Sequence, residues 1–504
     1  MAGVADSLRG LLTVPPSVRG ARVRTYTGLS ALLTGLLVFA VPVGAVAVGL
    51  PVGPLLVAAA GVYVLAVVLL DAAFEGLCVA LVVTAVFNTR AAIELPDPVG
   101  GQLRLVSVLA VATAGLFVLD GGLSRQWLRR PDRALVVGAF AVFVLWGALA
   151  AAAGNGPRPV AAALYVAEQS RYLCLLVLSA LAVDRTDPES VVVPLTFGLG
   201  ATLVFAVDEV FAGRGGYLAD LGSVGLEIAR LWPSPSLTSF PRGATVLYEG
   251  GAFGQNRTMV GLATVFVPIV IAAATRSRRH APLALASLFG LVSIVASSSH
   301  AAIAALYAGL LPVGIYVLFL AADRAGLERA RRLVVPLSVA GIALAVGAVL
   351  LATAAGADRI LLVRTNNLGV RLQQYAAAID VAARYPLVGV GGGRNVAAVA
   401  GTAVHNVFLH HLAATGVPGF LAYVTSLAGA TGLCLWRCLD ADAVDRWCWV
   451  GVLGGLLAFY VYGFWVVASR WELLNAAHWL LVGVVVGADG CPARLRTALG
   501  RLRP

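Results

Sequence analysis

Residues Arg371–Leu421 read RLQQYAAAIDVAARYPLVGVGGGRNVAAVAGTAVHNVFLHHLAATGVPGFL, and they join a polar segment to the start of a long apolar run. The order is an arginine-bearing helix, a glycine-rich turn, a second arginine and the pair His405-Asn406. The apolar run begins directly after that pair. The stretch therefore predicts polar chemistry placed at the edge of a hydrophobic helix.

The composition of the chain excludes an ordinary soluble domain. Of its 504 residues, 60% are hydrophobic and 12% are charged, and the mean hydropathy is +0.90. Repeated apolar runs approach the roughly 20 residues that a helix needs to cross a bilayer. We expect an all-α polytopic transmembrane bundle of about 12–14 spans, with residues 1–504 forming a single integral membrane domain. The predicted spans are 28–49, 52–70, 72–88, 104–120, 134–153, 164–183, 191–212, 257–275, 281–299, 301–322, 333–354, 404–436, 447–468 and 473–488.

Clusters of arginine predict the orientation of these spans. They precede the first span, recur in three loops and close the chain, and counting spans puts all of them on one side. The positive-inside rule makes that side cytoplasmic. We therefore expect a multi-pass protein of the cell membrane with both termini in the cytoplasm. The net charge of +11 then reflects topology and gives no reason to expect nucleic-acid binding.

Two long loops are predicted on the opposite, extracytoplasmic side, at 213–256 and 355–404. The second loop breaks the charge rule, because five arginines face only two aspartates there. Long loops cross the membrane despite their charge, so these arginines are either solvated surface groups or an anion site at the membrane edge. The chemistry of guanidinium is consistent with the anion site, because guanidinium groups bind phosphate in a bidentate manner. The arginines are Arg359, Arg364, Arg371, Arg384 and Arg394.

Local signals divide the loop 355–404 into smaller parts. Asn366 and Asn367 are good helix N-caps, and Pro386 disfavours a helix that continues past Tyr385. We expect a short amphipathic helix near the membrane surface, within a loop that as a whole carries the proposed active site. Its two faces carry Arg371, Tyr375 and Ala378 on one side and Leu372, Ile379 and Ala383 on the other.

The glycine-rich run 389–393 and the pair His405-Asn406 each allow two interpretations. The glycines form either a flexible turn or a backbone nest that approaches an anion beside Arg394. A histidine at the start of a helix is usually a polar cap, but it is also the side chain best suited to general base catalysis near neutral pH. The residues alone leave both alternatives open.

Taken in order, these motifs resemble the signature region of the O-antigen ligase and Wzy-type polymerase superfamily of membrane glycosyltransferases. The resemblance rests on Arg371 followed by Tyr375, on YPLVGVGGGRN at 385–395, and on the His-Asn pair before LxxLAxTGxxGF. Upstream, GAFGQN at 251–256 is similar to a glycine–phenylalanine–asparagine segment of the family. SSSH at 297–300 stands where members usually have serine and arginine.

The resemblance implies a metal-independent and cofactor-independent transfer in cell-envelope polysaccharide biosynthesis. A glycan would leave a polyprenyl-pyrophosphate carrier and join an acceptor hydroxyl, on a glycan or lipid, at the outer face of the membrane, with inversion at the anomeric carbon. Carried over, His405 is the catalytic base and Arg371 holds the leaving diphosphate. The expected substrate-binding residues are Arg394, Arg364, Asn406, Arg257, His300, Asn256 and Tyr375.

The chain departs from the family pattern at His300, where a second arginine is expected. His300 itself, Arg257, Arg364 or Arg394 would have to supply that positive charge. A different class of function, a flippase-like transporter of lipid-linked glycans, would also carry polar groups within spans. Transport favours polar groups near the midplane and repeated halves, whereas this chain gathers its arginines and His405 in an outer loop. We therefore favour the enzyme.

Overall fold

A computed structural model describes part of the chain in detail. The described residues are 92–95, 101–104, 130–185, 188, 192, 257–276, 291, 300–325, 365–440, 446–465 and 472–488. Among the sequence predictions, the loop 213–256, Asn256 and Arg364 lie outside these residues, and so do seven of the fourteen spans apart from the single residues 104, 192 and 291. Those spans are 28–49, 52–70, 72–88, 104–120, 191–212, 281–299 and 333–354.

The described part is a bundle of helices with one small hairpin, and all seven remaining predicted spans are found as helices. The helices are α8 (Pro131–Ala153), α9 (Pro159–Arg185), α13 (Arg257–Arg276), α15 (His300–Arg324), α17 (Thr365–Arg384), α18 (Arg394–Ala400), α19 (Val407–Asp440), α20 (Arg446–Trp465) and α21 (Glu472–Gly487). Strands β1 (Ala92–Leu95) and β2 (Gly101–Arg104) pair antiparallel, with Ala92 opposite Arg104. This hairpin was not predicted, and it is the local exception to the all-α expectation.

Length and composition make the bundle a membrane domain. Within the described residues, five helices are long and apolar enough to span a bilayer: α8, α9, α15, α19 and α20. Two shorter apolar stretches, Gly261–Thr275 and Leu474–Gly487, accompany them in α13 and α21. In lipid a helix satisfies every backbone group internally, which is why apolar runs of this length fold as helices there. The chain is therefore a multi-pass helical membrane protein, as expected.

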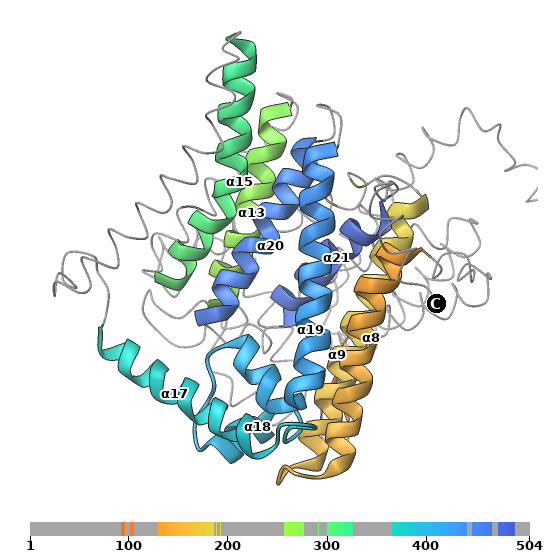
Figure 1. The fold of residues 1–504 in the computed structure, drawn as a ribbon, viewed down its shortest axis with the longest axis vertical. Helices are drawn as coiled ribbons and strands as arrows, with labels where there is room; N and C mark the ends of the chain where they lie inside the picture. The colour runs from red at the N-terminus through yellow and green to blue at the C-terminus, as the bar shows by residue number, and fades with distance from the viewer. Residues whose placement is uncertain are drawn as a thin grey trace, which may run out of the picture.

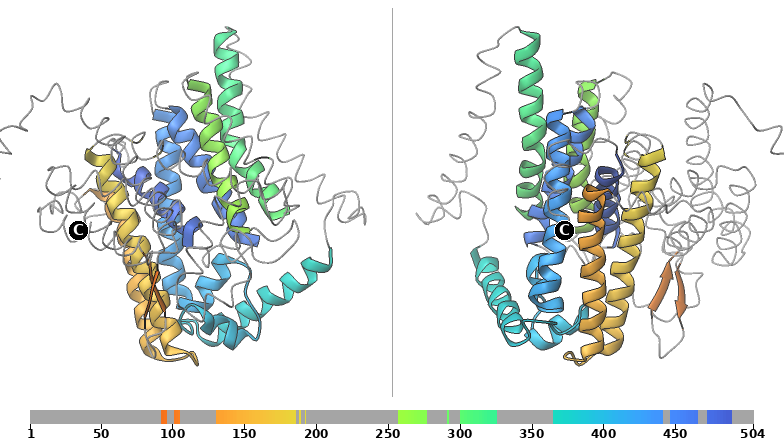
Figure 2. Two further views of the ribbon diagram at one scale, coloured as in Figure 1. Left: turned by 180° about the vertical axis from the view of Figure 1, so that it is seen from behind. Right: turned by 45° about the vertical axis from the view of Figure 1, so that its right-hand side comes forward.

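The spanning helices form two packed groups that meet along α19 and α20 (Figures 1 and 2). In one group α8 packs on α19 and α9 packs on α21, and in the other α20 packs on α13 and α15. Small residues bring helices of the second group close together, because a Cβ added to Gly454 would lie 2.4 Å from the carbonyl oxygen of Gly309. Such close contact through small residues is the usual basis of helix association in membranes.

Helices α17 and α18 lie across one end of the bundle, beside the turn that joins α8 to α9 (Figures 1 and 2). Unlike the spans, α17 does not run along the bundle, and it packs against α19 and α18. The predicted amphipathic helix between Asn366 and Tyr385 thus corresponds to α17, which ends at Arg384. This end of the bundle holds five of the residues that the sequence assigned to the site, namely Arg371, Tyr375, Arg394, His405 and Asn406.

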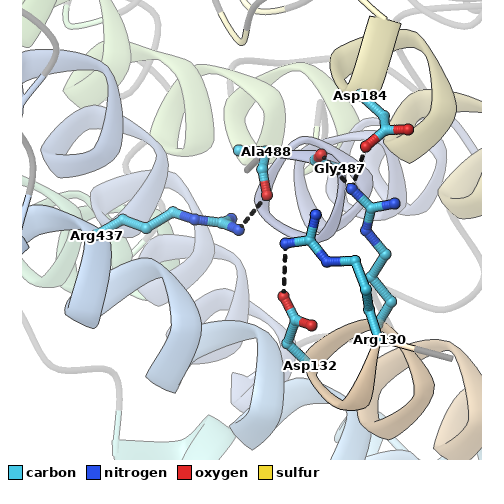
Figure 3. A network of polar contacts seen from close by, with 7 residues as sticks. Arg130, Asp132, Asp184, Arg437, Gly487 and Ala488 are labelled. Atoms are coloured by element: carbon cyan, nitrogen blue, oxygen red, sulfur yellow. Dashed lines mark hydrogen bonds and ion pairs between the residues drawn. The ribbon is translucent and has the colours of Figure 1, made fainter. Parts of the chain in front are cut away.

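At the opposite end of α8, buried arginines close the bundle (Figure 3). Arg133 on α8 donates to Asp184 of α9 and to the carbonyl oxygen of Gly487 at 3.0 Å. Arg437 on α19 donates to the carbonyl oxygen of Ala488 at 2.7 Å. The last carbonyls of a helix have no partner within it, so these guanidinium groups cap the end of α21 and tie four helices together.

Candidate functional site

His405 lies in the short segment before α19, and its ring is held in one tautomer. Its Nδ1 atom is 3.0 Å from Oε1 of Gln374 and 3.1 Å from the carbonyl oxygen of Ala403. A backbone carbonyl only accepts hydrogen bonds, so Nδ1 must carry the proton when the imidazole is neutral. The Nε2 atom then carries the lone pair. This orientation lets Nε2 of His405 accept a hydrogen bond.

Gln374 and Arg371 reach His405 from the same face of α17. They are three residues apart, which places both side chains on one side of a helix. The side chain of Gln374 is buried, whereas Arg371 is half-buried. Nη1 of Arg371 donates to the carbonyl oxygen of His405 at 3.4 Å, a long hydrogen bond. The structure therefore places the guanidinium of Arg371 directly beside the backbone of His405.

Asn406 fixes the start of α19 behind the imidazole. Its side-chain oxygen accepts from the backbone N–H groups of Phe408 at 2.9 Å and Leu409 at 3.0 Å. This is an N-cap, which satisfies backbone donors that a helix leaves unpaired at its first turn. The cap determines the direction in which residue 405 leaves the helix. The oxygen of Asn406 is therefore committed to local structure, and its amide nitrogen is the part that faces other groups.

Tyr375 completes this group of four predicted residues. Its hydroxyl donates to the carbonyl oxygen of Phe464 at 2.9 Å, which links α17 to the end of α20. Burial raises the pKa of Tyr375, while a hydrogen bond with the side chain of Asn406 and the charge of Arg371 partly oppose that rise. The hydroxyl stays protonated at neutral pH, so Tyr375 serves as a neutral polar group next to Arg371.

The glycine-rich run is a tightly packed support for this group. Gly389, Gly391 and Gly393 have φ angles between 65° and 76°, which side chains rarely tolerate. Gly392 has a second constraint, because a Cβ there would lie 2.1 Å from the ring of Tyr165. Every glycine of the run is thus required by backbone conformation or by space. This favours a packing role over both a flexible turn and an anion nest.

The backbone groups of this run are paired with a kink in α19. Gly416 has φ 68° and interrupts the helix, and Pro418 has no N–H to donate to the carbonyl of Ala414. The carbonyl oxygens of Ala413 and Ala414 instead accept from the N–H groups of Val390 at 3.1 Å and Gly391 at 3.0 Å. The carbonyl groups at the kink therefore pair with N–H groups of the glycine run. The N–H groups of Val390 and Gly391 are for this reason not available to an anion.

The turn between α8 and α9 holds the same segment from the other side. Nε1 of Trp146 donates to the carbonyl oxygen of Leu387, and the amide of Asn155 donates to that of Gly389, both at 2.9 Å. Asn395 forms two bonds with the backbone of Arg158, accepting from its N–H at 2.8 Å and donating to its carbonyl at 3.0 Å. The segment between α17 and His405 is thus attached to two spans.

The structure does not join every predicted site residue to this group. Arg394 is the first residue of α18 and is exposed, and no described hydrogen bond or ion pair links it to His405. Arg257 and His300 are the first residues of α13 and α15, and only their backbone is described. The grouped residues are therefore His405, Arg371, Tyr375 and Asn406.

Sequence reasoning missed Gln374 and the environment of His411. Gln374 lies at helical spacing from Arg371, and that spacing was an available signal. Nδ1 of His411 is 2.5 Å from the hydroxyl of Tyr165 on α9, and its ring lies 4.3 Å from that of Tyr423. No local pattern connects residues 246 positions apart. His411 therefore belongs to the packing of the bundle, apart from His405.

A comparison with known protein families matches the part of the chain that contains these residues. Residues 284–424 match the sequence model of a family described as O-antigen ligase. The matched segment includes α15, α17, α18 and the first half of α19, and so it contains Arg371, Gln374 and His405. No curated protein matches the chain. The match confirms the resemblance to the O-antigen ligase superfamily and supports glycan transfer of that general kind.

Proposed function

We propose that this chain is a membrane glycosyltransferase. It moves a glycan from a polyprenyl-pyrophosphate carrier to an acceptor hydroxyl, in the manner of an O-antigen ligase or a polysaccharide polymerase. The observation that carries the proposal is the tautomer of His405, whose Nδ1 faces two oxygens while Nε2 holds the lone pair. That base lies beside Arg371, within the segment that matches the ligase family.

The proposed reaction is a single displacement. Nε2 of His405 accepts the proton of the acceptor hydroxyl as its oxygen attacks the anomeric carbon. The bond from that carbon to the pyrophosphate oxygen breaks, and the electron pair leaves with the diphosphate. Attack opposite the leaving group inverts the anomeric configuration. The product is a new glycosidic bond, and the carrier pyrophosphate is released.

Arg371 stabilises the charge that develops on the leaving diphosphate in this proposal. A fixed cation at that position acts mainly in the transition state and needs no metal ion. Tyr375 and the amide nitrogen of Asn406 line the same place. Arg394, Arg364, Arg257, His300 and Asn256 complete our proposed binding set for the donor. We place this site on the extracytoplasmic side, with both termini in the cytoplasm.

The test of the base is His405→Gln, which keeps a polar side chain but removes the basic nitrogen. Transfer of glycan from a purified lipid-linked donor should fall by about 100- to 10,000-fold. The amount of protein inserted in membranes should stay unchanged. Full transfer by this variant would exclude His405 as the base. Donor that crosses the membrane but never joins an acceptor, in the native protein, would favour the flippase-like alternative.

A strain that lacks the gene for this protein distinguishes a ligase from a polymerase. Mass analysis of surface glycans should show carrier-linked polymer accumulating if the protein is a ligase. Single repeat units without long chains would indicate a polymerase. Unchanged surface glycans would contradict both.

A further inference from the structure

Helix α17 presents three different sides along its length. One side packs against the protein and includes Gln374, Ala378 and Val381, all buried. A second side is exposed and apolar, at spacings of four, seven and eleven residues from its first member. It consists of Leu372, Ala376, Ile379 and Ala383. A third side is exposed and polar, and consists of Gln373, Asp380 and Arg384. Residues at such spacings lie along one stripe of a helix.

An exposed apolar stripe beside an exposed polar stripe is unusual for a surface that faces only water. Leu372 is 57% exposed and Ile379 is 52% exposed, although each is a large apolar side chain. A helix at a lipid–water boundary has this division, because one side contacts acyl chains while another contacts water. The remaining side of α17, which includes Gln374, Ala378 and Val381, is already occupied by the protein itself.

The segment that follows α17 is attached to a span with an exposed apolar side. Leu387, which follows α17, is 68% exposed, and its carbonyl is bound by Trp146 of α8. On α8 the neighbouring Leu145 and Leu149 are also exposed, on a helix long and apolar enough to span a membrane. The segment that follows α17 is therefore attached to a candidate span that carries exposed apolar side chains.

The middle of α17 is attached to a second membrane-facing point. Tyr375 donates to the carbonyl oxygen of Phe464, and the two rings lie 6.1 Å apart. Phe464 is 47% exposed at the end of α20, another candidate span. This contact places the middle of α17 at the level where α20 ends, and the helix lies across that end of the bundle (Figure 1).

We infer that α17 lies in the plane of the membrane at the lipid–water boundary. Its apolar stripe contacts the bilayer, and its polar stripe contacts water. The occupant of the exposed apolar stripe is therefore lipid, since α17 and the segment after it are attached to two candidate spans that carry exposed apolar side chains of their own. A second copy of the chain would have to displace this lipid along both helices.

This placement has a consequence for the site, which rests on the proposed function. Arg371 and Gln374 face inward from a helix whose outer side contacts lipid. His405 then lies at the depth of the lipid head groups, and a lipid-linked donor reaches it sideways from the bilayer. The placement of α17 itself does not depend on the reaction.

Spin labels test the placement directly, in the full-length protein in lipid vesicles with its six native cysteines replaced. Nitroxides on Ile379→Cys and Asp380→Cys form a matched pair, because these adjacent residues lie on the apolar and the polar stripe. Collision rates with oxygen, which concentrates in lipid, and with a nickel chelate, which stays in water, are compared. Labels on Leu145→Cys and Arg158→Cys serve as lipid and water references and confirm that the protein is folded.

The oxygen-to-nickel ratio should be several-fold higher for the Ile379 label than for the Asp380 label, and it should approach that of the Leu145 label. Equal, water-like ratios at both positions would overturn the inference. Spin–spin broadening of the Ile379 label that persists when the protein is diluted in lipid would also overturn it, because a second copy would then cover the stripe. Since no activity is measured, the result is independent of the proposed function.

Discussion

The two ends of the bundle both carry arginines, but the protein holds them in different ways. In the arginine cluster of Figure 3, Arg133 is 2% exposed and Arg437 is 5% exposed, and both cap α21. Arg437 also lies over the ring of Trp449 at 5.0 Å. At the other end Arg371 is half-buried, and its hydrogen bond to the carbonyl of His405 is long.

This difference in burial and partners distinguishes the structural arginines Arg133 and Arg437 from Arg371, the candidate for a role in the reaction. A buried guanidinium that binds helix-terminal carbonyls stabilises the fold, and removing it leaves those groups unpaired. A half-buried guanidinium beside an oriented base keeps surface for an incoming anion. The number of arginines at each end therefore says little about function, whereas their burial and partners say much.

The largest expected effect comes from substituting one arginine at each end of the bundle and comparing the two variants. Arg371→Ala should lower glycan transfer by about 100- to 1,000-fold, the usual effect of removing one stabilising group from a transition state. Arg384→Ala, an exposed arginine of the same helix, is the matched control and should leave transfer near the native rate. Arg133→Ala should retain transfer per folded molecule but lower the free energy of unfolding by about 1.5–3 kcal/mol.

Rates from a lipid-linked donor and thermal unfolding in detergent distinguish these variants. A stable but inactive Arg133→Ala protein would contradict the division between the two ends. So would native transfer by Arg371→Ala.

Gln374→Glu tests whether α17 orients the base. A carboxylate at this buried position favours the charged imidazolium and raises the pKa of His405. A general base must be neutral, so the acidic limb of kcat/KM against pH should move upward by about one unit. Gln373→Glu, at an exposed neighbouring position, should not move the limb. A shift of equal size in both variants, or in neither, would show that Gln374 does not act through His405.

Gly392→Ala tests whether the glycine-rich run 389–393 is packed tightly against Tyr165. The added methyl group would meet the ring of Tyr165, and overpacking of this kind costs about 1–3 kcal/mol of stability. Gly432→Ala is the control, because nothing lies within 4 Å of a Cβ there. Thermal unfolding should distinguish the two. If both variants melt alike, the glycine run is not packed as described.

The smallest expected effect is that of a chelator. Transfer should be unchanged when EDTA is added, since the proposed reaction relies on Arg371 for charge stabilisation. The measurement is the initial rate of glycan transfer with and without EDTA, with added magnesium as the reverse test. Strict dependence on a divalent ion would replace the proposed mechanism with a metal-assisted one.

Local sequence signals predicted more of the fold than of the contacts within the site. The helix predicted between Asn366 and Tyr385 was found as α17, and the grouping of Arg371, Tyr375 and His405 was expected from the resemblance to the ligase family. The role of the glycine run did not follow, because it depends on Tyr165 and on the kink at Gly416. The hairpin β1–β2 was also missed, since its strands are only four residues each.

The sequence by itself determined the membrane class of this protein and the positions of its described spans. Both depend on the length of apolar runs relative to the bilayer, which is a property of neighbouring residues. Only the tertiary structure decided which side of α17 faces the protein, which oxygen orients His405 and which arginines are consumed by the fold. These contacts join residues as far apart as Arg133 and Gly487, and no local pattern records which distant surface a side chain will meet.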